Sequence, residues 1–168
     1  MKRLLPFLLS IITMGVWGQH AYEVERGIKR NNVYISGDWM TRNLSASLNY
    51  ERLLLISKQG NIRISSSLGY GRWFTVDGKG SHYNMDFHFL AGSGTIMLEA
   101  STGLRCMDNE GHYFYIEPPE FSAGAESEQY SFFPNLNLGF RYQKPGGHLL
   151  FRTALGIPLL QISLGYQF

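Results

Sequence analysis

Apolar and polar residues alternate strictly along most of the chain from residue 33 onward, a period of about two that is typical of β-strands with one apolar and one polar face. Between residues 44 and 50, for example, leucine, alanine, leucine and tyrosine alternate with serine, serine and asparagine. The pattern recurs in eight segments, at about 33–39, 44–50, 62–70, 83–89, 96–104, 136–142, 149–157 and 162–168. No window of comparable length repeats at the helical period of about 3.6 residues. The sequence therefore predicts an all-β chain of eight strands.

The connections between these segments fall into two classes by length. Tight turns follow the second, fourth and sixth segments, at residues 57–60, 92–94 and 144–147, and they are rich in residues that tolerate turn geometry. Longer connections, at about 75–81 and 107–130, lie at the opposite end of an antiparallel sheet. This division is typical of outer-membrane barrels, whose turns are periplasmic and whose loops are outside. We therefore expect an eight-stranded antiparallel up-and-down transmembrane β-barrel over residues 33–168, with both termini periplasmic.

The N-terminus has the features of a secretory signal peptide, a basic pair, Lys2 and Arg3, followed by an apolar stretch over residues 4–16. We expect a signal peptide over residues 1–18 and a periplasmic lead-in over residues 19–32. The formal charge of +2 belongs to the basic pair, because 15 basic against 13 acidic residues becomes 13 against 13 once it is removed. A neutral chain has no general electrostatic attraction to nucleic acid, so no nucleic-acid partner is expected.

The polar faces of the predicted strands carry mainly serine, asparagine and glycine, which suit the narrow interior of a small barrel. Acidic and basic residues on these faces are nearly equal in number, and we expect them to pair because an unpaired buried charge is costly. The predicted interior polar network comprises Glu51, Arg63, Asp86, Glu99, Arg105, Arg141 and Arg152. Side chains fill the interior of a barrel of this size, so an open pore is not expected.

Aromatic residues on the apolar faces fall into two groups, one near each end of the predicted barrel. The group at the periplasmic end is Tyr50, Tyr142, Tyr166 and Phe168, and the group at the outer end is Trp39, Tyr70, Tyr83 and Phe132. Such rings settle where hydrocarbon meets headgroups. We therefore expect two interface bands in contact with outer-membrane lipids and lipopolysaccharide.

The end of the sequence carries a family resemblance. Ile162, Leu164, Tyr166 and Phe168 alternate with polar or small residues, and this pattern resembles the C-terminal signal of outer-membrane barrels. The stretches 47–53 and 138–143 are similar to the small outer-membrane β-barrel domain family, and more distantly to the transmembrane domain of outer-membrane protein A. The resemblance implies that the last strand is read by the barrel-assembly machinery. It implies no particular chemistry.

The connection at residues 107–129 is acidic and aromatic, with six Asp and Glu residues and no Lys or Arg. It is suited to an extracellular protein partner, to divalent cations that bridge lipopolysaccharide, or simply to closing the outer mouth as a solvated cap. It lacks the ligand spacing of a calcium loop, and we predict neither a metal nor another cofactor. The predicted interaction loop uses Asp108, Glu110, Tyr113, Tyr115, Glu117, Glu120 and Phe121.

Two alternatives from other functional classes are retained. Barrels of this size include enzymes that acylate or deacylate lipid A, and these need a serine nucleophile with a histidine base. Ser81 beside His82 offers both groups, but neighbours on a strand point to opposite faces. The long connection offers His112 or Ser122, with Glu110 or Glu117 nearby. A soluble periplasmic barrel of the lipocalin type, which binds an apolar ligand, would show the same alternation. We favour a monomeric outer-membrane barrel without catalytic residues, in a structural or surface-interaction role.

Overall fold

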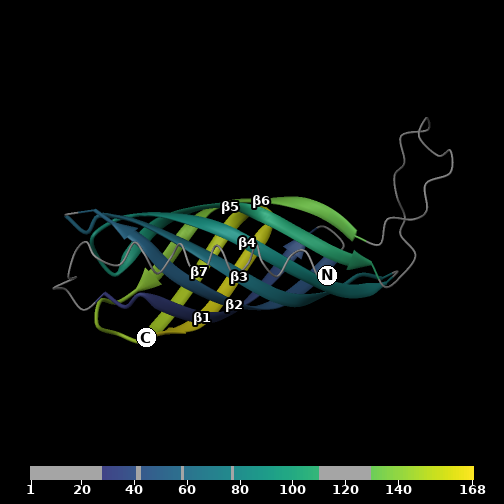
Figure 1. The fold of residues 1–168 in the computed structure, drawn as a ribbon, viewed down its shortest axis with the longest axis horizontal. Helices are drawn as coiled ribbons and strands as arrows, with labels where there is room; N and C mark the ends of the chain where they lie inside the picture. Colours follow the sequence, from purple (N-terminus) through teal and green to yellow (C-terminus); the bar gives the residue numbers. More distant parts are fainter. Residues whose placement is uncertain (1–27, 41–42, 58, 77, 110–129) are drawn as a thin grey trace, which may run out of the picture.

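The structure, a computed structural model, describes residues 28–40, 43–57, 59–76, 78–109 and 130–168 and forms a closed barrel in which each strand is antiparallel to both neighbours. The strands are β1 (Asn31–Met40), β2 (Asn43–Ile56), β3 (Ile62–Phe74), β4 (Lys79–Ala91), β5 (Ile96–Asn109), β6 (Tyr130–Gln143), β7 (Leu149–Ile157) and β8 (Leu160–Gln167). The barrel closes where β8 pairs with β1, and Figure 1 shows all strands wrapped around one long axis. The predicted eight-stranded antiparallel barrel is confirmed.

The alternation seen in the sequence becomes an alternation between the inside and the outside of the barrel. In β2, Ser47, Asn49 and Glu51 are buried, whereas Leu48 and Tyr50 between them are exposed. Side chains on a strand point alternately to the two faces. The direction of one side chain in a regular strand therefore fixes the directions of the others in that strand. The interior is consequently polar and the outside apolar, which is the reverse of an ordinary core.

The two ends of the barrel differ in their connections. Short turns at residues 57–61, 92–95 and 144–148 lie at one end, which we call the short-turn end. The start of β1 and the close of β8 lie there too, because Asn32 pairs with Gln167, and Figure 1 shows the C-terminus beside these turns. The connection between β5 and β6, residues 110–129, lies outside the described residues, as do residues 1–27 with the predicted signal peptide.

Most strands extend beyond the segments expected from alternation, as β4 does by beginning at Lys79, inside the expected connection 75–81. Strand β1 begins at Asn31, two residues before the predicted start at 33, because its ladder with β2 already includes the pair Asn31 and Arg52. Strand β5 extends to Asn109, so Met107 and Asp108 lie in the sheet, paired with β4 and β6, rather than in a loop. Alternation in the sequence cannot locate the ends of strands. A strand continues as long as the adjacent strands supply hydrogen-bond partners for its backbone groups.

The register between β2 and β3 shifts once, between Leu53 and Leu55. A bulge of this kind leaves the extra residue without a ladder partner on that side and turns the strand. On the other side of β2, the backbone N–H of Leu53 donates to the carbonyl of Arg30 at 2.8 Å, so the chain before β1 is bonded to the edge of the barrel. No helix in the described ranges is long and apolar enough to cross a membrane.

Candidate functional site

The barrel interior is the candidate site, because the titratable side chains converge there. All seven residues of the predicted interior polar network point inward, and each is at most 5% exposed. They come from β2, β3, β4, β5, β6 and β7. Inside the barrel the strands bring together residues that are as far as 123 positions apart in the sequence.

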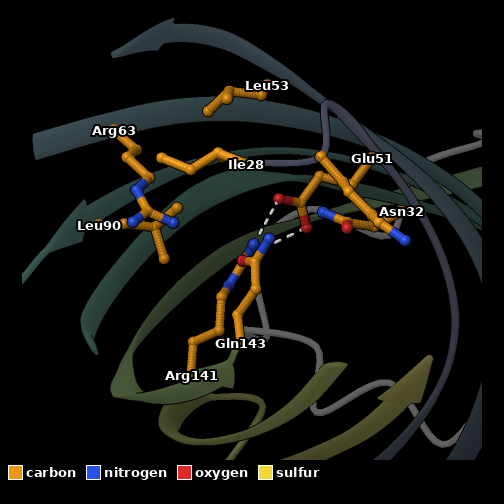
Figure 2. Close-up of a pocket in the computed structure, with 9 residues that line it drawn as sticks. Ile28, Asn32, Glu51, Leu53, Arg63, Leu90, Arg141 and Gln143 are labelled. Carbon is orange, nitrogen blue, oxygen red and sulfur yellow. Dashed lines mark hydrogen bonds and ion pairs between the residues drawn. The ribbon is translucent and has the colours of Figure 1, made fainter. Parts of the chain in front are cut away.

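Arg141 lies at the centre of a cluster that links opposite walls of the barrel. Its Nη1 and Nη2 donate to the two carboxylate oxygens of Glu51 at 2.6 and 2.9 Å, and its Nε donates to Glu99 Oε2 at 2.6 Å. Figure 2 shows the Arg141 side chain reaching across to Glu51. Arg152 Nη2 donates to the second oxygen of Glu99. The two guanidiniums and two carboxylates therefore form one cluster, which we call the central charge cluster.

Further polar side chains contact the carboxylates of this cluster. Ser65 Oγ donates to Glu51 Oε1 at 2.6 Å, and His88 Nδ1 lies 3.1 Å from Glu99 Oε1. The other ring nitrogen of His88 is 2.8 Å from Ser67 Oγ. Such additional hydrogen bonds are what a buried ion pair needs if its attraction is to offset the cost of desolvation. The central charge cluster is thus a packed network rather than a set of isolated pairs.

Asp38, which the sequence analysis did not include among the interior charges, carries a second cluster near the other end. Arg105 Nη2 donates to Asp38 Oδ2, Ser45 Oγ donates to the same oxygen at 3.0 Å, and Gln161 Nε2 donates to Asp38 Oδ1 at 2.9 Å. A signal for Asp38 was present in the sequence, since its neighbour Trp39 belongs to the apolar face. With Asp38 included, the interior holds four carboxylates and four guanidiniums.

Two of the seven predicted residues form no ion pair within the described ranges. Asp86 is held by amides instead, because Asn84 Nδ2 and Asn135 Nδ2 donate to its two oxygens at 3.0 and 2.8 Å. Arg63 donates only to the carbonyl of Gly60, at 3.4 Å. Acidic and basic side chains are therefore equal in number in the interior, but only some of them form an ion pair with a neighbour of opposite charge.

A small recess lies beside Arg63 at the short-turn end. Ile28, from the chain before β1, lines it together with Leu53, Leu90 and Arg141, and these side chains are among those drawn in Figure 2. The recess has room for about one water molecule. It is too small for an organic ligand, which needs a cavity of about 300 Å³ or more.

The arrangement offers little for catalysis or metal binding in the part of the chain that the structure describes. No group of three or more His, Cys, Asp or Glu residues there is arranged to hold a metal ion. Ser81 Oγ lies 3.3 Å from Tyr70 OH, whereas His82 is buried in the interior, and neither of its ring nitrogens has a hydrogen-bond partner among the described residues. Ser81 and His82 are therefore not paired, and His112 and Ser122 lie outside the described residues.

The predicted interface aromatics are all on the outside of the barrel. Trp39, Tyr50, Tyr70, Tyr83, Phe132, Tyr142, Tyr166 and Phe168 are each exposed. Tyr50, Tyr142 and Tyr166 lie toward the short-turn end, and the rings of Tyr70 and Tyr83, on adjacent strands, are 5.1 Å apart. The outer surface thus presents aromatic rings along its length.

The predicted assembly signal and interaction loop occupy different places. Ile162, Leu164, Tyr166 and Phe168 form the exposed face at the end of the chain, alongside the seam where β8 meets β1. Of the loop residues only Asp108 is described, on β5. The others lie outside the described residues: Glu110, Tyr113, Tyr115, Glu117, Glu120 and Phe121.

Comparison with known proteins supports the fold assignment. No protein-family model matches the sequence, and no curated protein matches it. Among solved structures, the chain is similar to the N-terminal β-barrel domain of Pseudomonas aeruginosa OprF, with a TM-score of 0.62 and 14% identity, over 85% of this chain and 100% of that one. The expected likeness to small outer-membrane barrels is thereby confirmed for the fold, and the chain shares the barrel architecture of the OprF domain.

Proposed function

We propose that this protein is an integral outer-membrane β-barrel with a closed interior and a structural or surface-interaction role. The observation that best supports this is the inverted polarity of the barrel, with charged and amide side chains inside and large apolar side chains outside. Folding in water is driven by the removal of apolar surface from water, which would produce the opposite arrangement. A surrounding of lipid acyl chains accounts for it.

Leu104, Leu136 and Phe140 illustrate the size of the effect. They lie on the adjacent strands β5 and β6, and they are 60%, 59% and 57% exposed. Transfer of one such side chain from water to an apolar surrounding is worth about 1.5–3 kcal/mol, and similar side chains continue around every strand. Soluble monomers rarely expose apolar patches larger than about a few hundred Å². The surface therefore favours a membrane barrel over a soluble periplasmic one.

The packed interior argues against solute passage. The central charge cluster crosses the barrel from β2 to β6, so an ion in transit would have to separate Arg141 from Glu51. The recess beside Arg63 holds about one water molecule. We therefore propose that the barrel acts as a membrane-embedded scaffold that carries the connection between β5 and β6.

Orientation and partners follow from this proposal. We place the short-turn end and both termini in the periplasm, in the usual sense of outer-membrane barrels. The acidic and aromatic connection at 110–129 then lies outside the cell, where it would meet lipopolysaccharide or an extracellular protein. The final strand is proposed as the segment that the barrel-assembly machinery reads. The barrel is proposed to act as a monomer without a cofactor.

The membrane proposal predicts a heat-dependent change in gel mobility. Unheated protein from the outer-membrane fraction is expected to migrate faster in detergent gels than boiled protein, because the closed barrel stays compact until heat unfolds it. In planar bilayers the refolded protein should show no steady conductance. Recovery of the protein in the soluble periplasmic extract, with a single gel mobility, would contradict the proposal.

The proposed orientation predicts selective proteolysis. The connection at 110–129 contains glutamates but no lysine or arginine, so a glutamate-specific protease added to intact cells is expected to cut there. The lead-in offers Glu23 and Glu25 as an internal control, and these should be cut only after the outer membrane is permeabilised. Mass spectrometry of the fragments distinguishes the two. Cleavage of the lead-in on intact cells would invert the proposed orientation.

A further inference from the structure

Basic side chains outside the barrel interior gather at the short-turn end. Lys29, Arg30, Arg52 and Lys144, which we call the basic arc, lie at the start of β1, near the end of β2 and in the turn after β6. Within the described ranges no acidic side chain outside the interior lies at this end, since Asp108 is at the opposite one. The rim therefore carries a concentrated positive charge, although the chain beyond residue 18 is formally neutral.

The basic arc is continuous in space across five strands. Asn31, which follows Arg30, pairs with Arg52, and this joins β1 to β2. Lys29 Nζ lies 2.5 Å from His148 Nδ1 and 3.3 Å from the carbonyl of Gln167, which joins the chain before β1 to β7 and β8. Lys144 and His148 belong to the same short turn between β6 and β7. The arc thus runs along β6, β7, β8, β1 and β2.

An aromatic layer lies directly beside the basic arc, on its membrane side. Tyr50 and Tyr142 each precede a basic residue by two positions, as in Tyr50 and Arg52. Within β2 this spacing puts Tyr50 and Arg52 on the outer face, separated along the strand by about 7 Å. The Tyr166 ring stacks on His148 at 4.8 Å, with Lys29 Nζ 6.0 Å from its centroid. Charge, aromatic ring and apolar side chain therefore follow one another toward the middle of the barrel.

The described residues of the other two short turns do not repeat this succession of basic and aromatic side chains. The described residues of the turns after β2 and β4, namely 57, 59–61 and 92–95, are serine, glutamine, glycine, asparagine and threonine. They include neither a basic nor an aromatic side chain. Lys58, in the turn after β2, lies outside the described residues.

We infer that the basic arc binds the headgroups of anionic phospholipids in the leaflet that meets the short-turn end. The inference rests on the proposed membrane location. Acyl chains would lie on exposed side chains such as Leu149 and Leu164, glycerol and ester groups beside the tyrosines, and the anionic headgroup against the arc. Basic side chains beside an anionic leaflet are attracted to it within about a Debye length of the surface. A lipid fits better than a soluble anion, because the apolar and basic surfaces are contiguous.

The opposite end supplies a matched comparison. Arg72 and Lys79 are exposed there, and Arg72 repeats the two-residue spacing from an outward tyrosine, Tyr70. However, Asp108 lies in the same cross-strand row, because Arg72 pairs with Ser81 and Ser81 pairs with Asp108. A carboxylate in that row opposes the approach of an anion. Arg52 with Lys144 at one end, and Arg72 with Lys79 at the other, therefore give matched pairs of one arginine and one lysine in different electrostatic surroundings.

The test compares the double variants R52Q/K144Q and R72Q/K79Q with the unmodified protein in neutral maltoside micelles. Phosphatidylglycerol is titrated in, and bound lipid is counted by native mass spectrometry, with phosphatidylcholine as a reference that carries a phosphate but no net charge. The unmodified protein is expected to prefer phosphatidylglycerol. R52Q/K144Q should bind it about thirtyfold more weakly, whereas R72Q/K79Q should stay within about twofold.

Several outcomes would overturn the inference. These are equal binding of the two lipids by the unmodified protein, unchanged affinity in R52Q/K144Q, equal losses in both variants, and displacement of the lipid by millimolar inorganic phosphate. Failure of the membrane proposal is seen separately, because all three proteins are first checked for the heat-dependent mobility change after refolding into phosphatidylcholine vesicles. A protein that inserts there but shows no lipid preference contradicts only the lipid-binding inference.

Discussion

Replacement of Arg141 by methionine is expected to lower the free energy of unfolding by about 3–5 kcal/mol, the usual cost of removing one partner from a buried ion pair. The methionine retains much of the side-chain volume but none of the hydrogen bonds. Glu51 would lose both bonds from Arg141, and Glu99 would lose one. Arg152 would then face two buried carboxylates alone, and only Ser65 would still donate to Glu51.

Urea titration of the protein refolded into phosphatidylcholine vesicles, followed by fluorescence and by gel mobility, measures this loss. The matched control is R63M, which also removes a buried guanidinium, but one that contacts no carboxylate within the described ranges. R63M is expected to change the free energy of unfolding by less than about 1 kcal/mol. Similar losses in R141M and R63M would mean that the arginines stabilise the barrel through packing alone.

A second variant tests whether the cost arises from the stranded carboxylate. In E51Q/R141M the glutamine keeps the shape of Glu51 and still accepts from Ser65, but it carries no charge. We expect this double variant to be more stable than R141M, because an uncompensated buried charge costs more than a polar amide with fewer hydrogen bonds. If E51Q/R141M is less stable than R141M, the hydrogen bonds of Glu51 matter more than its charge.

Alternation made the inside and the outside of this barrel predictable from the sequence. A strand has only two faces. Once the apolar residues of a strand are placed on the outside, the residues that alternate with them must point to the inside. The structure accordingly places the seven expected charges inward. Asp38 is not among them because the first apolar segment is short and includes Gly37, which weakens the alternation there.

The pairing of the interior charges could not be read from the sequence. Glu51 and Arg141 lie on β2 and β6, which are not neighbours in the sheet, so no register rule relates them. Their meeting depends on the tilt of the strands and on the diameter of the closed barrel. The bulge between Leu53 and Leu55 is a similar case, because alternation carries no signal for a shift of one residue.

Substitution of an inward-facing glycine is expected to have the second large effect on stability. At several glycines, neighbouring atoms already occupy the space that a Cβ would need. A Cβ added to Gly139 on β6 would overlap the carbonyl oxygen of Thr153 and would lie 2.7 Å from the Cβ of Ala154. Both obstacles belong to β7, which is held in the sheet by β6 on one side and β8 on the other. We therefore expect G139A to lower the free energy of unfolding by about 2–3 kcal/mol.

Gly37 is the matched control, because it lies on a strand of the same sheet but faces outward. A Cβ there meets no atom within 4 Å, so G37A should leave stability unchanged or raise it by about 0.5–1 kcal/mol through the smaller backbone entropy of the unfolded chain. In the same urea titration, G139A/A154G should recover only part of the loss, since the Thr153 carbonyl stays in place. Equal stability of G139A and G37A would show that β6 and β7 can separate at little cost, and that the interior is less tightly packed than the clash at Gly139 indicates.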